Sequence, residues 1–167
     1  MIKIGIDVGS TTAKLVAVDE NDNLLFSKYE RHNAKAKETI LSFLKELLSE
    51  IGDKDISVRI TGSIGMGISE KCSLPFVQEV VAAAKAIQKD YSHVTSMIDI
   101  GGEDAKVVFF KDAEATDLRM NGNCAGGTGA FIDQMAIILG VNIDELNQLA
   151  MNATQVYPIA SRCGVLL

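Results

Sequence analysis

The sequence of 167 residues lacks an apolar run long enough to span a bilayer. Its longest run near the middle, Val77 to Ile87, contains Glu79 and Lys85, and a spanning helix needs about 20 apolar residues. The first residues, MIKIGID, enter a strand pattern at once and have no signal-peptide character. The sequence therefore predicts a cytoplasmic protein without a membrane partner.

Basic clusters are missing as well. Lys and Arg number 16 against 22 Asp and Glu, which gives a formal net charge of −6. An acidic chain without a local basic patch is not expected to bind nucleic acid. The sequence also has no G-x-x-x-x-G-K-[ST] motif, which excludes a P-loop phosphate site.

Cysteine is scarce, and its number is odd. Cys72, Cys124 and Cys163 are the three in the chain. Without a secretion signal, a disulfide framework is not expected, so free, buried or metal-bound thiols are the alternatives.

What the sequence does contain is enough apolar material for a core, at 47% of residues, arranged in two similar successions of strands and helices. The first succession predicts strands over Ile2–Val8, Thr12–Asp19, Leu24–Glu30 and Ile56–Ile60, and helices over 35–51 and 76–89. The second predicts strands over Val94–Ile100, Ala105–Phe110 and Glu114–Met120, and helices over 130–139 and 144–152. The segment TGSIGMG has glycine spacing that is wrong for a dinucleotide fingerprint and is interpreted as a strand-to-helix loop.

A repeated motif begins each succession. IDVGSTTAK at Ile6–Lys14 and IDIGGEDAK at Ile98–Lys106 are identical at five of nine positions. We interpret them as two copies of one structural unit, over residues 1–92 and 93–167, with the second unit incomplete. The alternative is a coincidence between two ordinary β-hairpins.

Each copy places an aspartate at a strand end, just before a glycine-bearing turn. Backbone N–H groups around such a turn bind phosphate oxygens, and a carboxylate at this position can hold hydrated Mg²⁺. Asp7 and Asp99 are thus candidate magnesium ligands, Thr11 and Thr12 add hydroxyl donors, and Lys14 adds a cation. The pattern indicates phosphoryl transfer, in which positioning and charge neutralisation dominate catalysis.

The two motifs resemble the phosphate motifs of the actin, Hsp70 and sugar-kinase superfamily of ATPases. Within it, the whole chain resembles the activators of 2-hydroxyacyl-CoA dehydratases and the related benzoyl-CoA reductase ATPase subunits, the BadF/BadG/BcrA/BcrD ATPase family. The residues that carry this narrower resemblance are NGNCAGGTGAF at 121–131, YPIASRCGV at 157–165, TGSIGMG at 61–67 and LPFVQEV at 74–80. The resemblance implies an α/β fold of duplicated ribonuclease H-like (actin-like ATPase) domains, with mixed sheets and helices on their faces.

The resemblance also implies a redox cofactor. Two thiolates per chain cannot complete the four-cysteine ligand set of an iron–sulfur cluster, but a symmetric homodimer supplies four. In the family, a 4Fe–4S cluster bridges two subunits, and Cys124 and Cys163 match its ligands. The alternative is two buried free thiols, and Cys72, which has no partner motif, is expected to be structural.

The implied activity is ATP hydrolysis coupled to anaerobic electron transfer from the cluster to a 2-hydroxyacyl-CoA dehydratase or similar CoA-substrate enzyme. A ferredoxin or flavodoxin would be the electron donor. The implied catalytic residues are Asp7, Asp99 and Glu103. The residues implied to bind ATP or ADP are Gly9, Ser10, Thr11, Thr12, Lys14, Gly101, Gly102, Asp104, Lys106, Gly127, Thr128 and Gly129.

Two points depart from the pattern of the family. A Gln commonly follows the glycine pair in the shorter activators, and the carboxylate of Glu103 adds repulsion near a phosphate unless Mg²⁺ or Lys106 offsets it. The adenosine-binding glycine segment expected later in the superfamily is absent up to Leu167, so this polypeptide alone is expected to bind nucleotide poorly.

Three other side chains carry separate expectations. Glu79 either joins the cation site or is a solvated helix residue. His32 and His93 are expected at the surface.

Two other functions remain open from the sequence. One is a small-molecule kinase of the same superfamily in which the cysteines are incidental, although no substrate-pocket motif is evident. The other is a non-catalytic, actin-like regulatory or assembly module that binds ATP.

Overall fold

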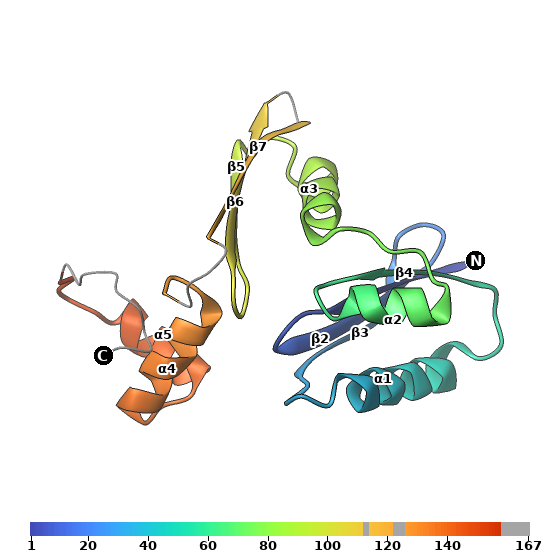
Figure 1. Ribbon diagram of the computed structural model, residues 1–167, viewed down its shortest axis with the longest axis horizontal. Helices are drawn as coiled ribbons and strands as arrows, with labels where there is room; N and C mark the ends of the chain where they lie inside the picture. Colours follow the sequence, from blue (N-terminus) through green and yellow to red (C-terminus); the bar gives the residue numbers. More distant parts are fainter. Residues whose placement is uncertain (112–113, 122–125, 158–167) are drawn as a thin grey trace. The chain divides into compact units, whose positions relative to one another are not determined.

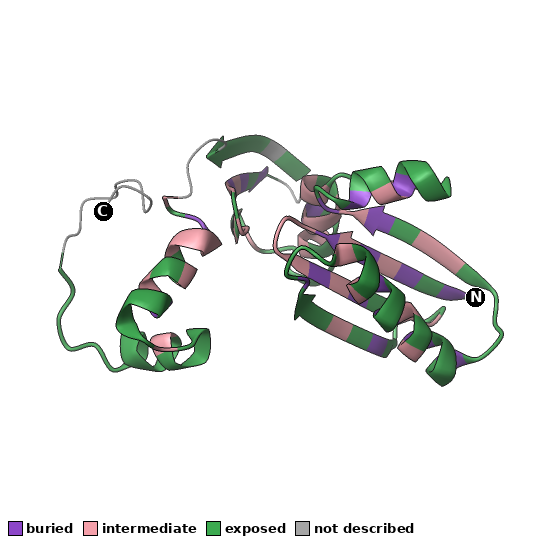
Figure 2. Ribbon diagram, turned by 60° about the horizontal axis from the view of Figure 1, so that its bottom comes forward, coloured by how far each residue is buried: buried purple, intermediate pink, exposed green. Residues whose placement is uncertain are grey.

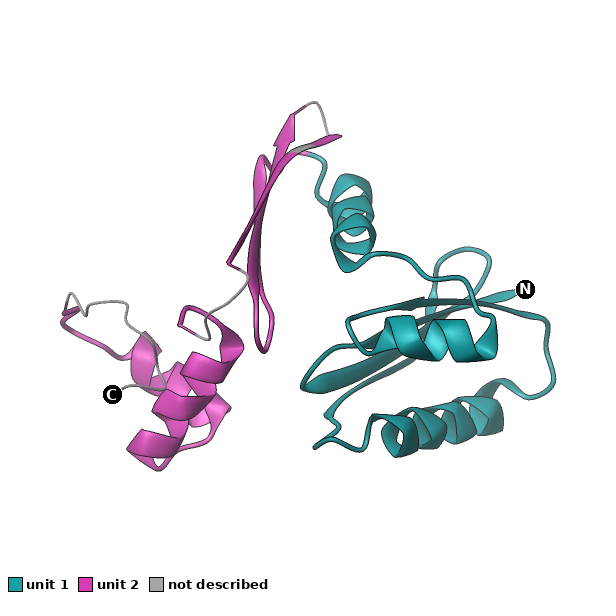
Figure 3. Ribbon diagram, viewed as in Figure 1, with its two compact units in different colours: residues 1–92 teal, residues 93–167 magenta. Residues whose placement is uncertain are grey.

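The computed structural model describes residues 1–111, 114–121 and 126–157, and it divides into two compact units (Figures 1 and 3). Unit 1 comprises Met1–Ser92 and unit 2 comprises His93–Leu167. The boundary falls between the two copies of the repeated motif, so each unit contains one copy.

Unit 1 is a four-stranded mixed sheet with three helices. Its elements are β1 (Ile2–Val8), β2 (Thr12–Val18), β3 (Leu24–Arg31), α1 (Ala36–Ile51), β4 (Ile56–Thr61), α2 (Gly65–Cys72) and α3 (Glu79–Asp90). The strand order is β3-β2-β1-β4; β1 pairs with β2 antiparallel and with β4 parallel. This order makes β1 a central strand, so the residues at its end have neighbours on both sides.

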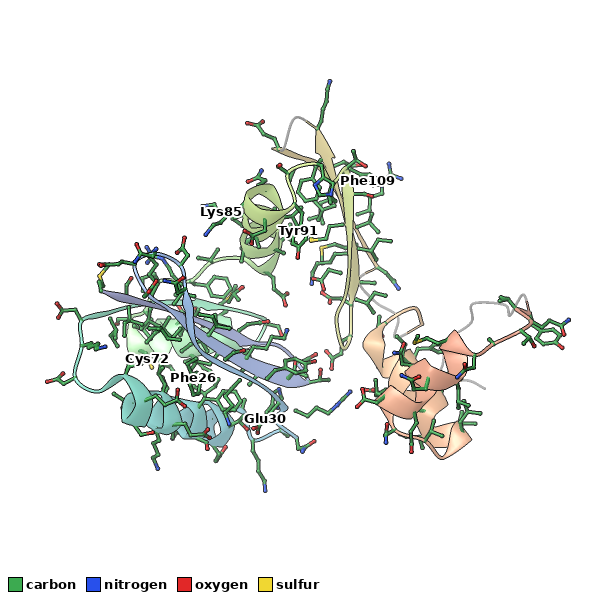
Figure 4. All side chains as sticks on the ribbon, turned by 180° about the vertical axis from the view of Figure 1, so that it is seen from behind. Phe26, Glu30, Cys72, Lys85, Tyr91 and Phe109 are labelled. Atoms are coloured by element: carbon green, nitrogen blue, oxygen red, sulfur yellow. The ribbon has the colours of Figure 1, made fainter. Side chains whose placement is uncertain are left out.

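The core of unit 1 lies on one face of this sheet. Alternate residues of β1 and β2 are buried there, which produces the banding along the strands in Figure 2. From α1, Phe43 and Leu47 pack into the same cluster, and Phe26 of β3 joins them (Figure 4). Burying a large apolar side chain contributes about 1.5–3 kcal/mol, so this face holds unit 1 together.

The expected helix over 76–89 and the expected loop at TGSIGMG are both wrong in part. A helix, α2, already runs from Gly65 to Cys72, and the next helix, α3, begins only at Glu79. Between them the chain runs extended beside β4, where the N–H of Val77 donates to the carbonyl oxygen of Ile60. Glycine lowers helix propensity, so Gly65 and Gly67 made this segment resemble a loop in the sequence. Tertiary contacts with β1 and β4 stabilise α2 in the structure.

The described residues of unit 2 form three antiparallel strands in the order β5-β6-β7 and two helices. The elements are β5 (Ser96–Ile100), β6 (Ala105–Lys111), β7 (Glu114–Asn121), α4 (Gly129–Leu139) and α5 (Ile143–Met151). Helix α5 begins with a capping box, in which Asn142 and Glu145 each accept the other's backbone N–H. In the described part of the chain, no helix combines the length and apolar character needed to cross a membrane.

Candidate functional site

The first copy of the repeated motif forms the β1–β2 hairpin turn. The N–H of Gly9 donates to the carbonyl oxygen of Thr12 at 3.0 Å, which closes a tight turn. Asp7 and Lys14 lie directly opposite each other in the register, and Lys14 Nζ is 2.7 Å from Asp7 Oδ2. The motif therefore places a carboxylate and an ammonium group side by side at the base of the turn.

Two opposing effects act on the charge of Lys14. Partial burial lowers the pKa of Lys14, whereas its hydrogen bond to Asp7 and the negative charge of Asp7 raise it, with Glu79 adding to the same effect. The raising effects prevail, so the pKa lies above the ordinary value for lysine. Lys14 is consequently a permanent cation beside the turn, and Glu79, at the start of α3, belongs to its electrostatic surroundings.

The second carboxylate oxygen of Asp7 has a different environment. Oδ1 of Asp7 and Oγ1 of Thr61 are buried, and neither has a hydrogen-bond partner among the described residues. The two residues are paired across the parallel strands β1 and β4. Buried oxygens without a partner call for an explanation, and a cation or its water ligands would satisfy both.

Gly62 makes this arrangement possible. Its φ of +93° favours glycine, and a Cβ atom there would lie 2.6 Å from Asp7 Oδ1 and 2.3 Å from the carbonyl oxygen of Val8. Only a residue without a side chain can therefore follow Thr61 at this close approach. Beside these residues, a cavity of about 300 Å³ opens on the sheet face opposite the core. It is lined by Gly5, Ile6, Asp7, Lys14, Val16, Arg59, Ile60, Thr61, Val77 and Ala82.

The second copy has the same register with different side-chain partners. Asp99 lies opposite Lys106 in the β5–β6 hairpin, and the N–H of Gly101 donates to the carbonyl oxygen of Asp104 at 2.8 Å. Here Lys106 Nζ is 2.7 Å from Asp104 Oδ2, whereas Asp99 Oδ2 is farther from it, at 3.9 Å. The lysine is therefore held mainly by the turn aspartate, and the carboxylate of Asp99 is less tightly engaged than that of Asp7.

Helix α4 is docked on this second turn. The N–H groups of Gly129 and Ala130 donate to the carbonyl oxygens of Gly101 and Gly102, at 2.8 and 3.0 Å. Thr128, the residue before the helix, is fully buried. The structure thus brings the two predicted glycine segments of unit 2 together, and the N–H of Gly129 is engaged within the protein.

The other predicted site residues are dispersed. Glu103 is exposed at the tip of its turn. Cys124 and Cys163, the predicted cluster ligands, lie outside the described residues, within which no group of three or more His, Cys, Asp or Glu side chains forms a metal site. Cys72, which was expected to be structural, is an exposed free thiol at the end of α2 (Figure 4).

His32 is a residue that the sequence reasoning missed. The surface position expected for it is wrong: it is only 4% exposed, and its Nε2 lies 3.0 Å from the carbonyl oxygen of Gly9. No local pattern signalled this burial, because the positions that alternate with the buried Phe26 of β3 are the half-buried Lys28 and the exposed Glu30. His93, by contrast, is exposed, as expected.

Comparison with known proteins places the chain in a family. The family model described as the BadF/BadG/BcrA/BcrD ATPase family matches residues 4–167. The (R)-2-hydroxyglutaryl-CoA dehydratase activating ATPase of Acidaminococcus fermentans is 29% identical over 164 residues, which cover 97% of this chain and 63% of that protein. The chain spans between 62% and 65% of the length of four curated relatives that it matches.

Solved structures agree. The activator of the 2-hydroxyisocaproyl-CoA dehydratase from Clostridium difficile with bound ADPNP is 30% identical, with a TM-score of 0.85, over 99% of this chain and 62% of that one. Component A of (R)-2-hydroxyglutaryl-CoA dehydratase from A. fermentans is 28% identical, with a TM-score of 0.86, over 99% of this chain and 64% of that one. These findings confirm the α/β fold class and the resemblance predicted from the sequence motifs. The chain belongs to the BadF/BadG/BcrA/BcrD ATPase family.

Proposed function

We propose that this chain is the nucleotide-binding part of an ATP-dependent activator of a 2-hydroxyacyl-CoA dehydratase or a related CoA-substrate reductase. The single observation that carries the proposal is the duplicated hairpin with an aspartate and a lysine paired across each turn. Relatives described as dehydratase activators, and a related structure with bound ADPNP, support it. The activator works in the cytoplasm, as a homodimer that receives electrons from a ferredoxin or flavodoxin.

The two turns have the same role towards the nucleotide. The N–H groups of Ser10 and Thr11 in the first turn and of Gly102 in the second donate to phosphate oxygens, because those of Gly9 and Gly101 already close their turns. Lys14 and Lys106 neutralise part of the phosphate charge. Asp7 and Asp99 would hold Mg²⁺, and in unit 1 the unsatisfied Oδ1 of Asp7 and the neighbouring Oγ1 of Thr61 fit such an ion or its water ligands. The bound Mg²⁺ supplies charge neutralisation at the phosphates.

Hydrolysis then needs a positioned water rather than covalent chemistry. Glu103, at the tip of the second turn, is the proposed residue that orients this water. The ammonium group of Lys106 is proposed to offset the charge that a carboxylate adds next to a phosphate. The segment Gly127, Thr128 and Gly129 contributes to the nucleotide site at the start of α4, which the N–H of Gly129 holds on that turn, and Asp104 holds Lys106 in place.

Coupling to electron transfer depends on the two cysteines outside the described residues. Cys124 and Cys163 from each of two subunits would hold one 4Fe–4S cluster, whose chemistry is one-electron reduction of the partner enzyme. The flanking sequences CAGGTG and SRC support this part of the proposal.

Anaerobic purification of the full-length protein, followed by visible absorption and iron analysis, tests the proposal. We expect a brown protein that hydrolyses ATP, and loss of colour and iron in Cys124→Ser and in Cys163→Ser. Cys72→Ser is the matched control, because Cys72 is an exposed thiol and should leave the absorption unchanged. A colourless, iron-free protein that phosphorylates a small metabolite would contradict the proposal and favour a kinase.

A further inference from the structure

His32 is bonded to the first phosphate turn at two places. Its ring Nε2 lies 3.0 Å from the carbonyl oxygen of Gly9, and its backbone N–H donates to the carbonyl oxygen of Thr11 at 3.2 Å. A carbonyl oxygen only accepts hydrogen bonds, so Nε2 carries the proton in this contact. The buried ring, which lies outside the repeated motif, therefore holds the carbonyl group of Gly9, and the backbone of the same residue holds that of Thr11.

The chain just after His32 adopts a costly conformation. Asn33 and Ala34 both have positive φ, at 46° and 63°, and the N–H of Lys35 donates to the carbonyl oxygen of His32 at 2.7 Å. This is a two-residue turn with left-handed central residues, a conformation that costs an alanine roughly 1–2 kcal/mol. The tight turn thus reverses the chain directly after His32, whose ring contacts the carbonyl oxygen of Gly9.

The stereochemistry of the peptide unit gives this contact a consequence. In a trans peptide, the carbonyl group of one residue and the N–H of the next point in opposite directions, and no described peptide bond is cis. Because the oxygen of Gly9 is directed at His32, the N–H of Ser10 points to the opposite side of the turn. That N–H is one of the donors assigned above to the phosphate.

We propose that His32 is a positioning residue, which orients the Ser10 amide for phosphate by holding the carbonyl group of Gly9. The inference rests on the phosphate role assigned to this turn under the proposed function. The ring acts through Nε2 alone, since Nδ1 is buried without a hydrogen-bond partner among the described residues. A glutamine side chain, whose amide nitrogen reaches about as far as Nε2, can therefore replace it.

The experiment is an NMR titration of the ¹⁵N-labelled full chain with inorganic tripolyphosphate in the presence of Mg²⁺. The Ser10 amide signal is the reporter, and the method also measures weak affinities. The variants are His32→Leu, without a donor, His32→Gln, with a donor at the reach of Nε2, and His32→Asn, with one at the reach of Nδ1. The control is His93→Gln, which changes an exposed histidine.

We expect His32→Leu and His32→Asn to raise the dissociation constant at least about fivefold, the effect of one lost hydrogen bond. His32→Gln and the control should stay within about twofold of the unmodified chain. Normal affinity in His32→Gln together with loss in His32→Asn would distinguish a positioning role from a packing role. These two variants still test the positioning role if His32→Leu does not fold.

Three results would overturn the inference in different ways. Unchanged affinity in His32→Leu would contradict the positioning role of His32 alone and would leave the phosphate role of the turn intact. Equal loss in Gln and Leu would assign the histidine to packing. Failure of the unmodified chain to shift the Ser10 signal would contradict the phosphate role itself, and the inference with it.

Discussion

The two hairpins have the same register, yet their lysines have different partners. In unit 1, Lys14 bonds directly to the strand-end Asp7, and its side chain is 45% exposed. In unit 2, the equivalent Lys106 is 5% exposed and bonds to Asp104 in the turn. The turns GSTT and GGED have equal length, and Asp104 occupies the position of Thr12.

We attribute the difference to the last residue of the turn. A threonine at the last position of the turn offers no charge, so Lys14 turns towards the carboxylate across the strand pair. An aspartate at that position lies closer to the lysine and attracts it away from the strand end. One residue of the turn thus decides how tightly the strand-end carboxylate is engaged before any ligand binds.

The largest expected effect is on hydrolysis, and it tests whether the two aspartates are equivalent. Asp7→Asn and Asp99→Asn should each lower ATP hydrolysis by the full-length protein by on the order of 100-fold, because each removes a charge that serves the transition state. Phosphate release under steady-state conditions measures it. Asp53→Asn, in an exposed loop, is the control. Normal hydrolysis in Asp99→Asn together with loss in Asp7→Asn would show that only unit 1 carries the cation.

The second effect is on stability and concerns the partners of the two lysines. Asp104→Ala should lower the free energy of unfolding of unit 2 by about 2–3 kcal/mol, because it leaves the buried Lys106 without its close carboxylate. Thr12→Ala is the matched change in unit 1 and should cost well below about 1 kcal/mol. Urea unfolding, followed by a probe in each unit, measures both. An equal loss in the free energy of unfolding for both variants would mean that the ion pair of the buried Lys106 does not contribute to stability.

A gain of stability is expected at the turn after β3. Ala34→Gly should stabilise unit 1 by up to about 1 kcal/mol, because glycine adopts the φ of 63° without a steric penalty. Part of the gain is offset by the larger backbone entropy of glycine in the unfolded chain. Thermal unfolding of unit 1 is the measurement, and the transition of unit 2 should not move. A destabilised unit 1 would show that the left-handed turn carries no strain.

The smallest expected effect depends on pH and on the turn between β2 and β3. Hydrogen bonds from Lys89 and Lys3 lower the pKa of Asp22 from 3.8 to about 2. A depressed folded-state pKa contributes stability above the unfolded value and loses it as the pH falls through the folded one. Asp22→Asn should therefore flatten the fall in the melting temperature of unit 1 between pH 4 and pH 2. An unchanged acid limb would show that the exposed ion pairs contribute nothing.

Much of this molecule could be predicted from its sequence, for identifiable reasons. Alternation of apolar residues predicted both hairpins, and the repeated motif predicted Asp7 at the end of one strand and Lys14 on the returning strand, although not their ion pair. Helix α2 could not be predicted, because two glycines interrupt its pattern, and the close approach of Gly65 to β1 and β4 appears only in three dimensions. The partner of Lys106 and the burial of His32 depend on distances between side chains, which no local pattern encodes. The roles of the site residues remain predictions until the experiments above are done.

Gly62 gives the site an unusual mutational profile. Any residue with a side chain at this position would need a left-handed backbone and would press a carbon atom against Asp7 and the carbonyl group of Val8. A saturation library at position 62, selected for ATP hydrolysis, should return glycine in every surviving clone. The most intolerant position near the first turn would then be one that contributes neither charge nor donor, only the empty volume in which the carboxylate of Asp7 lies.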